Sequence, residues 1–248
     1  MVQRHHHGIR AACASLAAAA ALLCAPAGAT VLDFSSLPPS THTGGESLSQ
    51  YGYNIAFQEG PVAAYYGFSS AIGTVVNPLD PSSCEITACP AGASGNYLAI
   101  TNDGAVNFSR GGGFKLAGLD LAFLAPLGVP DASYGLLRLF GTELNGKVTS
   151  IELGFPGQNA AGDFLFGAAN IAREFRQLTL ASLTIDACVF DADNNCVNSL
   201  LQPASNQAQF AIDNLRFTEV PEPGSLLLLA GSLGVLLVQR RRQLNKGA

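Results

Sequence analysis

The segment YLAITNDGAVNFS, residues 97–109, contains the pattern that decides the fold. Two apolar runs of strand length, 97–101 and 105–109, flank Asn102-Asp103-Gly104. Asn, Asp and Gly readily adopt the positive φ angles that a tight turn between two strands requires. The segment therefore predicts a β-hairpin, and Asn145-Gly146 predicts a second one between 143–144 and 147–148.

Runs of the same kind continue on both sides, separated by clusters of Gly, Pro, Asn and Asp, as is typical of antiparallel β domains. They lie at 30–34, 52–57, 62–68, 97–101, 105–109, 114–124, 134–140, 148–153, 173–180, 182–190 and 209–218. In the last run the apolar alternation slips by one residue at Asp213-Asn214, which predicts a β-bulge. Gly111-Gly112-Gly113 predicts a flexible turn. We expect an all-β fold, an antiparallel two-sheet β-sandwich of jelly-roll-like type.

The first 29 residues have the composition of a secretory signal peptide. Arg4 and Arg10 accompany an apolar run that begins at residue 11, and Ala27-Gly28-Ala29 has the small residues of a cleavage site. We expect signal peptidase to cut after Ala29. Export then precedes folding of the rest of the chain.

The last residues combine a proline-rich segment, a short apolar stretch and a basic cluster. Residues 225–238 would form a helix about 21 Å long, shorter than the ~30 Å hydrocarbon core of a bilayer. Because arginines stay on the cytoplasmic side, the domain before this short transmembrane helix faces the other side. The residues that define the pattern are Pro221, Glu222 and Pro223 before the helix and Arg240, Arg241 and Arg242 after it.

This order resembles the PEP-CTERM sorting signal of Gram-negative bacteria, which the membrane peptidase exosortase recognises and cuts. The resemblance implies a transient stay in the inner membrane, then the cell surface or extracellular matrix, and a link with exopolysaccharide and biofilm. A tail anchor that is never cut is the alternative. QFAID at 209–213 is similar to the Gln-Phe-x-x-Asp subgroup of these proteins. The chain thus divides into a signal peptide, 1–29, a β domain, 30–219, and a sorting tail, 220–248.

Charge is distributed unevenly along the chain. Six of the 13 basic residues lie near the ends, which leaves seven basic against 18 acidic residues between Arg10 and Arg240. Binding to nucleic acid or to anionic lipid calls for clusters of Lys and Arg. An acidic body argues against both kinds of partner.

Four cysteines of the body form two close pairs in the sequence. An exported domain lies in an oxidising compartment, so we expect disulfides rather than free thiols. Zinc would need histidine partners, and the body has only His42. Local pairing is our preference among three connectivities. The cysteines are Cys84, Cys89, Cys188 and Cys196.

A calcium site is a hypothesis for two acidic regions, with no other cofactor expected. Asp191, Asp193 and Asn195 alternate like the start of a calcium loop, but Cys196 stands where an EF-hand has glycine. The final strand resembles jelly-roll domains of the carbohydrate-binding kind, in which an acid near its end helps to hold calcium. A solvated hairpin tip and a bulge residue are the respective alternatives. The candidate ligands are Asp186, Asp191, Asp193 and Asp213.

The sequence contains no recognisable catalytic motif. His42 is the single possible imidazole base of the body, without a nucleophile elbow, and the spacing of the acids singles out no catalytic pair. The six tyrosines could stack on sugars, but the chain has no Trp. We expect a non-catalytic structural or binding role. A polysaccharide-active enzyme with paired carboxylates and a calcium-dependent adhesin are the alternatives.

Overall fold

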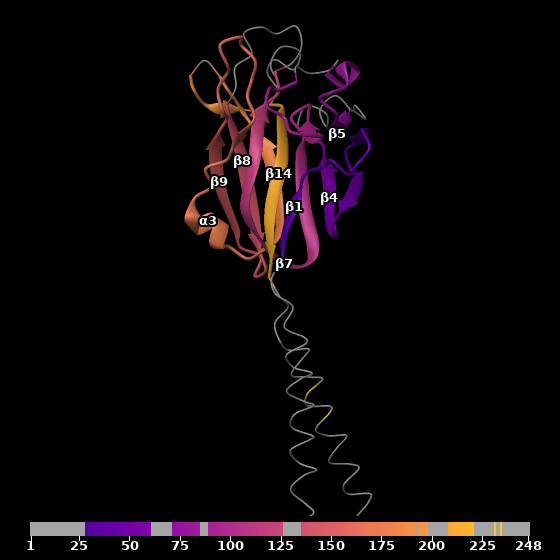
Figure 1. The fold of residues 1–248 in the computed structure, drawn as a ribbon. Helices are drawn as coiled ribbons and strands as arrows, with labels where there is room; N and C mark the ends of the chain where they lie inside the picture. The colour runs from indigo at the N-terminus through magenta and orange to yellow at the C-terminus, as the bar shows by residue number, and fades with distance from the viewer. Residues whose placement is uncertain are drawn as a thin grey trace, which may run out of the picture. The chain divides into compact units, whose positions relative to one another are not determined.

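The computed structural model describes residues 28–60, 71–84, 89–125, 135–191, 193–197, 208–220, 231 and 234. Gly28–Val220 form one compact unit, which is built almost entirely of strands (Figure 1). The elements are β1 (Ala29–Leu32), β2 (Ser40–Thr43), β3 (Ser47–Gln50), β4 (Tyr53–Gln58), β5 (Ala71–Val76), a 3₁₀ turn (Pro81–Cys84), β6 (Tyr97–Ile100), β7 (Ala105–Phe123), β8 (Leu136–Glu143), β9 (Val148–Gly154), β10 (Gly167–Ala168), α3 (Arg173–Gln177), β11 (Leu180–Ala187), β12 (Val189–Phe190), β13 (Cys196–Val197) and β14 (Phe210–Glu219).

The strands form two sheets that share β7. Sheet I contains β2, β5, β6, β14, the second half of β7 and β10, with β1 alongside β14 (Figure 1). Sheet II contains β3, β4, the first half of β7, β11, β8 and β9. Every pairing between these strands that the structure describes is antiparallel. The predicted all-β, antiparallel fold is confirmed.

The glycine triplet is where β7 passes from one sheet to the other. Residues 105–109 pair with β4, whereas 114–123 pair with β14. On β11, Ser182 pairs with Ser109, whereas Leu180, only two residues earlier, pairs with Phe114. Arg110 and the three glycines of β7 therefore lie outside the regular register. A side chain on Gly113 would meet Thr179 Cγ2 at 2.7 Å. The predicted flexible turn was wrong, because glycines here serve a strand that changes sheets through a bend.

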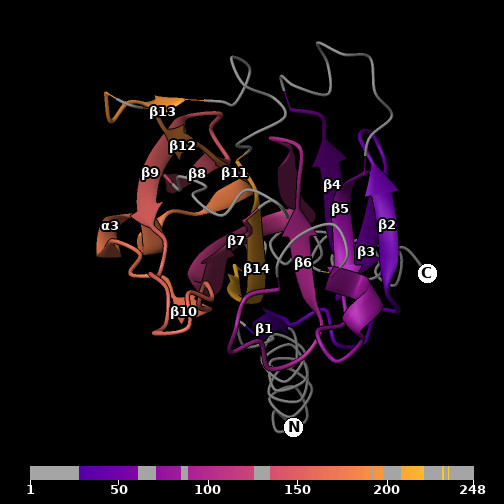
Figure 2. The same cartoon turned by 90° about the horizontal axis from the view of Figure 1, so that it is seen from above.

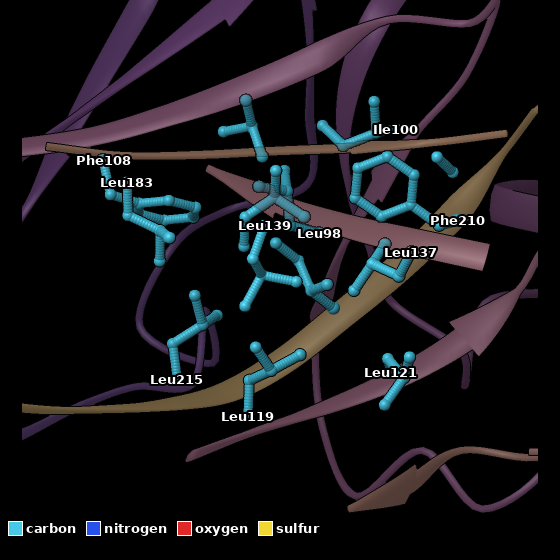
Figure 3. Packing of buried hydrophobic residues seen from close by; sticks show 14 of the residues in the cluster. Leu98, Ile100, Phe108, Leu119, Leu121, Leu137, Leu139, Leu183, Phe210 and Leu215 are labelled. Atoms are coloured by element: carbon cyan, nitrogen blue, oxygen red, sulfur yellow. The ribbon is translucent and has the colours of Figure 1, made fainter. Parts of the chain in front are cut away.

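One hydrophobic core lies between the two sheets (Figure 3). Phe108, Leu139 and Leu183 enter it from sheet II, and they meet side chains of sheet I, among them Leu98 and Leu215. All five are completely buried. Burial of apolar surface between two faces is the main stabilising contribution to such a domain.

A second, smaller cluster covers the outer face of sheet I. Tyr97, Ala99, Leu124 and Ala211 are buried there, and Phe166 packs against them. Its ring meets that of Tyr97 edge-on, with the centroids 5.3 Å apart. Central strands that are buried on both faces read as continuous apolar runs. This explains why β6 and the start of β14 do not alternate.

The turn at residues 101–104 has the predicted backbone but not the predicted pairing. Asn102 and Asp103 have φ angles of 56° and 53°, and Gly104 N–H donates to Thr101 O at 3.0 Å. However, β6 pairs with β5 and β14, while the start of β7 pairs with β4 and β11. The turn therefore links the two sheets, and the hairpin prediction was wrong in this respect.

Two other turn predictions are confirmed. Gly146 has a φ of 85° and joins β8 to β9, in which Thr142 pairs with Val148. The register of β14 shifts after Asp213, where Asn214 has a φ of 49°. Both positions need the left-handed backbone that Gly and Asn tolerate.

The strand predicted at 173–180 was wrong. Arg173–Gln177 form the single helical turn α3, and β11 begins only at Leu180. Phe175 anchors this turn in the core beneath Gly141, and α3 lies beside β9 in both views (Figures 1 and 2). Four charged or amide residues around one buried ring favour a helical turn over a strand.

Five of the described strands were not predicted: β2, β3, β5 and the two-residue strands β10 and β13. One prediction lies outside the described residues. The strands β2, β3 and β5 contain the Ser-, Thr- and Gly-rich sequences STHT, SLSQ and AIGTVV, whose apolar alternation is weak. The expected strand at 62–68 falls among residues that the structure does not describe. Within the part of the chain that it does describe, we find no helix with the length and apolar character to cross a membrane.

Candidate functional site

The two ends of the β domain meet where β14 leads into the sorting tail. Thr30 of β1 pairs with Phe217 of β14, and Glu219 N–H donates to Gly28 O at 3.1 Å. Val220 N–H then donates to Gly113 O at 3.0 Å. The regular hydrogen bonding of the domain thus extends to Val220.

A charged cluster closes this end of the core. Arg110 forms an ion pair with Glu219, and its guanidinium lies 5.1 Å from the ring centroid of Tyr53. Tyr53 in turn stacks on Phe217, with 4.6 Å between the ring centroids. The hydrogen bond from Arg110 lowers the pKa of Glu219, so this carboxylate stays charged at neutral pH.

The sorting residues themselves lie outside the described part of the chain. This holds for Pro221, Glu222 and Pro223, for Arg240, Arg241 and Arg242, and for residues 1–27 of the predicted leader. Of the expected transmembrane stretch, only Gly231 and Gly234 are described, both as helical.

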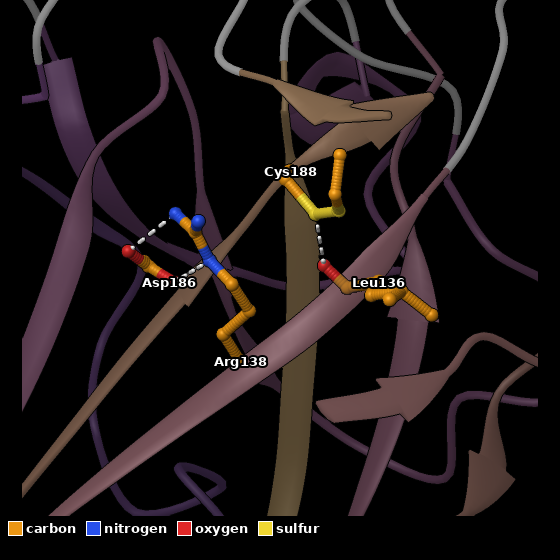
Figure 4. Close-up of polar contacts among 5 residues, drawn as sticks. Leu136, Arg138, Asp186 and Cys188 are labelled. Carbon is orange, nitrogen blue, oxygen red and sulfur yellow. Dashed lines mark hydrogen bonds and ion pairs between the residues drawn. A yellow bond between two sulfur atoms is a disulfide. The ribbon is translucent and has the colours of Figure 1, made fainter. Parts of the chain in front are cut away.

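The structure forms the two local disulfides that the spacing favours. Cys84 pairs with Cys89 and Cys188 with Cys196, with Cα–Cα distances of 5.5 and 5.4 Å. Tyr97 O–H donates to Cys89 Sγ at 3.2 Å, which ties the first disulfide to the outer cluster of sheet I. The second disulfide closes the β12–β13 ribbon (Figure 4). The backbone N–H of Cys188 donates to Leu136 O at 3.0 Å.

Asp186 is part of an ion pair on the outer face of sheet II (Figure 4). Arg138 Nε and Nη2 each donate to one carboxylate oxygen of Asp186 at 2.8 Å. The two residues are direct neighbours on β8 and β11. Partial burial nevertheless raises the pKa of Asp186, and Arg138 opposes that shift. Both carboxylate oxygens therefore have a fixed partner.

Asp191 organises its own loop. Its Oδ1 accepts from the backbone N–H groups of Asp193 and Asn195 at 2.9 and 2.8 Å, and Asn195 Nδ2 donates to Oδ2 at 3.2 Å. The backbone bond from Asn195 contributes most to the lowered pKa of Asp191. Asp193 is exposed. This geometry is that of an Asx turn at a hairpin tip.

Asp213 faces a second acid across the strand pair. Its register partner is Asp120 on β7, and Asn214 Nδ2 donates to Asp120 Oδ2 at 2.9 Å and to Asp213 Oδ2 at 3.2 Å. Asp213 is only 4% exposed. Burial raises its pKa to about 7, the N–H of Asn214 opposes this, and the charges of Asp120 and Asp33 add to it.

The four candidate calcium ligands thus fall into three separate environments: the Arg138 ion pair, the hairpin tip and the β14 bulge. Within the described ranges, no group of three or more His, Cys, Asp or Glu side chains is placed to hold a metal ion. The sequence pattern missed the partners Arg138 and Asp120, because each lies on a strand distant in sequence. Only the strand register reveals these contacts.

His42 lies on β2 beside two groups that a catalytic histidine would need. Ser40 Oγ lies 3.0 Å from its Nε2, and its ring stacks on Phe57 with centroids 4.8 Å apart. Glu46 Oε2 is 3.6 Å from Nδ1, beyond hydrogen-bond length, and accepts instead from Thr43 N–H at 2.9 Å.

The outer face of sheet II presents rows of mostly polar side chains. One row of cross-strand neighbours runs from β3 to β9, and the next row contains the Arg138–Asp186 pair. Asn107 Nδ2 donates to Thr184 Oγ1 at 2.8 Å, and the Arg138 guanidinium lies 5.9 Å from the ring centroid of Phe140. We name this surface the sheet II face; its first row is Ser47, Ala56, Asn107, Thr184, Phe140 and Ser150.

Comparison with known proteins decides the nature of the tail. Residues 219–243 match the family model described as the PEP-CTERM protein-sorting motif. The chain carries a PEP-CTERM sorting motif. A search of curated proteins finds no match to the chain.

This motif is the sorting signal of PEP-CTERM proteins, which are exported and processed by an exosortase. Its match begins at Glu219, the last residue of β14, so the sorting motif and the domain share this residue. The match does not include 209–213, and membership of the Gln-Phe-x-x-Asp subgroup stays a prediction.

Proposed function

We propose that this PEP-CTERM protein is delivered through the inner membrane to the cell surface or extracellular matrix of a Gram-negative bacterium. There it has a non-catalytic structural or binding role in the exopolysaccharide that surrounds the cell. The main support for the proposal is that β14 continues directly into the sorting motif, so that the β-sandwich is joined to the sorting signal without a linker. Signal peptidase and exosortase are its processing partners.

Loss of the exosortase should change both the size and the location of the protein. In a host with the enzyme, we expect a shortened chain in the surface or extracellular fraction, ending between Val220 and Ser225. A cut in this range keeps the hydrogen bond between Val220 N–H and Gly113 O. In a host without the enzyme, the chain should keep its tail and remain with the inner membrane. Fractionation followed by intact-mass measurement gives both results.

A double substitution within the motif tests the same step in a normal host. Pro221→Ala with Pro223→Ala should abolish the shortening, whereas Asn245→Ala, which lies beyond the matched residues, should leave it unchanged. A surface protein that still ends at Ala248 in the normal host would contradict exosortase processing. It would favour the uncut tail anchor.

The sheet II face supports a binding role. Its amide, hydroxyl, guanidinium and carboxylate groups lie on neighbouring strands, ~4.8 Å apart, and are held in place by their own hydrogen bonds. A partly exposed aromatic ring, that of Phe140, stands among them. Sugars present hydroxyl groups for hydrogen bonds and C–H faces for an aromatic ring. A preorganised polar surface of this kind suits a neutral polysaccharide better than a nucleic acid.

The purified protein should therefore retain the host exopolysaccharide without shortening it. We expect Phe140→Ala to weaken retention in affinity electrophoresis about tenfold, equivalent to ~1.4 kcal/mol. Tyr51→Ala is the matched control, because Tyr51 is an exposed aromatic residue in the β3–β4 turn. Size-exclusion chromatography of the polymer should show no decrease in length. Shortening of the polymer would favour the polysaccharide-active enzyme. Equal retention by both variants would exclude the sheet II face as the binding surface.

A further inference from the structure

The expected leader cleavage site lies inside a folded strand. Signal peptidase is expected to cut after Ala29, yet β1 begins at Ala29 and Glu219 donates to the carbonyl of Gly28. Cleavage therefore removes the Gly28 carbonyl, the acceptor for Glu219 N–H at the end of β14. It also creates a charged α-amine on Thr30, in the middle of the pairing between β1 and β14.

The carboxylate of Glu219 is placed to receive this amine. Thr30 Oγ1 donates to Glu219 Oε1 at 3.4 Å. Only the Cα and Cβ atoms of Thr30 separate its hydroxyl from its α-nitrogen, so the amine forms within a few ångströms of the same carboxylate. On the partner strand the amine lies opposite Phe217 and Thr218, the two residues that precede Glu219.

The neighbouring charged groups leave Glu219 as the acidic partner at this position. Arg110 on β7 shares its carboxylate, and Lys115 on β7 is the register partner of Thr218. Tyr53 on β4 stays neutral to high pH, because burial raises its pKa. The two cations lower the pKa of the new amine, whereas Glu219 raises it. Removing the charge of Glu219 should thus have a measurable effect on the amine.

We propose that Glu219 binds the α-amine of Thr30 once the leader has been removed. The proposal rests on the proposed export and on cleavage after Ala29. When Gly28 is present, Glu219 N–H donates to its carbonyl; in the mature chain, which lacks Gly28, the ion pair holds Glu219. Removal of the leader at one end of the chain thereby creates a contact that holds Glu219, the first residue of the sorting motif at the other end, in place.

The pKa of the α-amine is the direct test. A chain from Thr30 to Ala248, released from an N-terminal fusion and kept in detergent, is compared with its Glu219→Gln variant. Trace acetylation at a series of pH values, read by peptide mass spectrometry, gives the pKa. We expect it to be higher in the chain with Glu219 by about half a unit or more. The ion pair stabilises the fold fully below the ordinary pKa of an α-amine, and this stabilisation is lost as the pH rises through the raised pKa.

Two controls separate the ion pair from general effects. Thr30→Val removes the hydroxyl but keeps the amine and the carboxylate, so the pKa should stay raised. In a chain that begins at Ala20, the amine lies ten residues before Thr30 in the sequence, and Glu219→Gln should not change its pKa. Equal amine pKa values with Glu219 and with Gln, in chains that melt cooperatively, would overturn the proposal. A native N-terminus other than Thr30 overturns its cleavage premise, whereas the proposed function depends on the fractionation result.

Discussion

Replacement of Phe217 by alanine should lower the free energy of unfolding by about 3–5 kcal/mol, the usual cost of removing a buried aromatic side chain. Phe217 is completely buried at the end of the core where the sorting motif begins. Its ring lies 4.6 Å from that of Tyr53, 5.1 Å from that of Phe114 and 5.9 Å from that of Phe108, measured between centroids. The cavity left by alanine would remove all three contacts. Urea denaturation followed by circular dichroism measures the loss.

The neighbouring residue provides the matched control. Thr218 lies on the same strand, but its side chain points to the opposite face of the sheet and is only partly buried. Thr218→Ala should change the free energy of unfolding by less than about 1 kcal/mol. Similar losses for both variants would mean that the aromatic cluster does not hold this end of the sandwich.

The stability of the domain should decrease as the pH rises from about 4 to 7 because of Asp213. Its pKa is raised from 3.8 to about 7 by burial, mainly, and by the charges of Asp120 and Asp33. Between these values the folded chain binds a proton that the unfolded chain does not, so protonation favours the fold. The contribution is largest below pH 4, falls up to pH 7 and is constant above. About 4 kcal/mol is its upper limit, since each pKa unit corresponds to 1.36 kcal/mol.

An isosteric substitution isolates this effect. Asp213→Asn keeps an oxygen that can accept from Asn214 N–H, the bond that Asp213 makes at 2.7 Å, but carries no charge. Melting temperatures measured between pH 4 and 8 should lose most of their pH dependence in this variant, which should be more stable than the natural chain above pH 7. The exposed Asp193 is the control, because Asp193→Asn should leave the profile unchanged. An unaltered profile in Asp213→Asn would show that this carboxyl titrates normally.

Local chemistry made several elements predictable from the sequence. The positive φ angles at Asn102, Gly146 and Asn214 follow from residue types that tolerate them. The cysteine pairs are five and eight residues apart, so only short loops had to close. Such features depend on the nearest neighbours in the chain. For the same reason the last strand and its bulge follow from the local sequence at 209–218.

Features that depend on strand partners could not be predicted in this way. The residues of the turn at Asn102 are typical of a hairpin. However, β6 before it pairs with β5 and β14, and the start of β7 after it pairs with β4 and β11. Likewise, the ion pair of Asp186 with Arg138 was not predictable, because only the strand register places Arg138 opposite it. The sequence also contains no local signal that would pair Glu219 with Arg110. In each case the deciding contact comes from a residue many positions away.

The position of β14 within sheet I has a mechanical consequence. This strand is bonded on one side to β7 and on the other to β6 and β1. When the uncut chain is pulled by its tail, the tension enters through the strand that continues into that tail. Here it would act along an inner strand and load hydrogen bonds on both flanks in shear, rather than peel an edge strand away one bond at a time. The connection to the tail is thereby made at a place in the sheet that resists pulling.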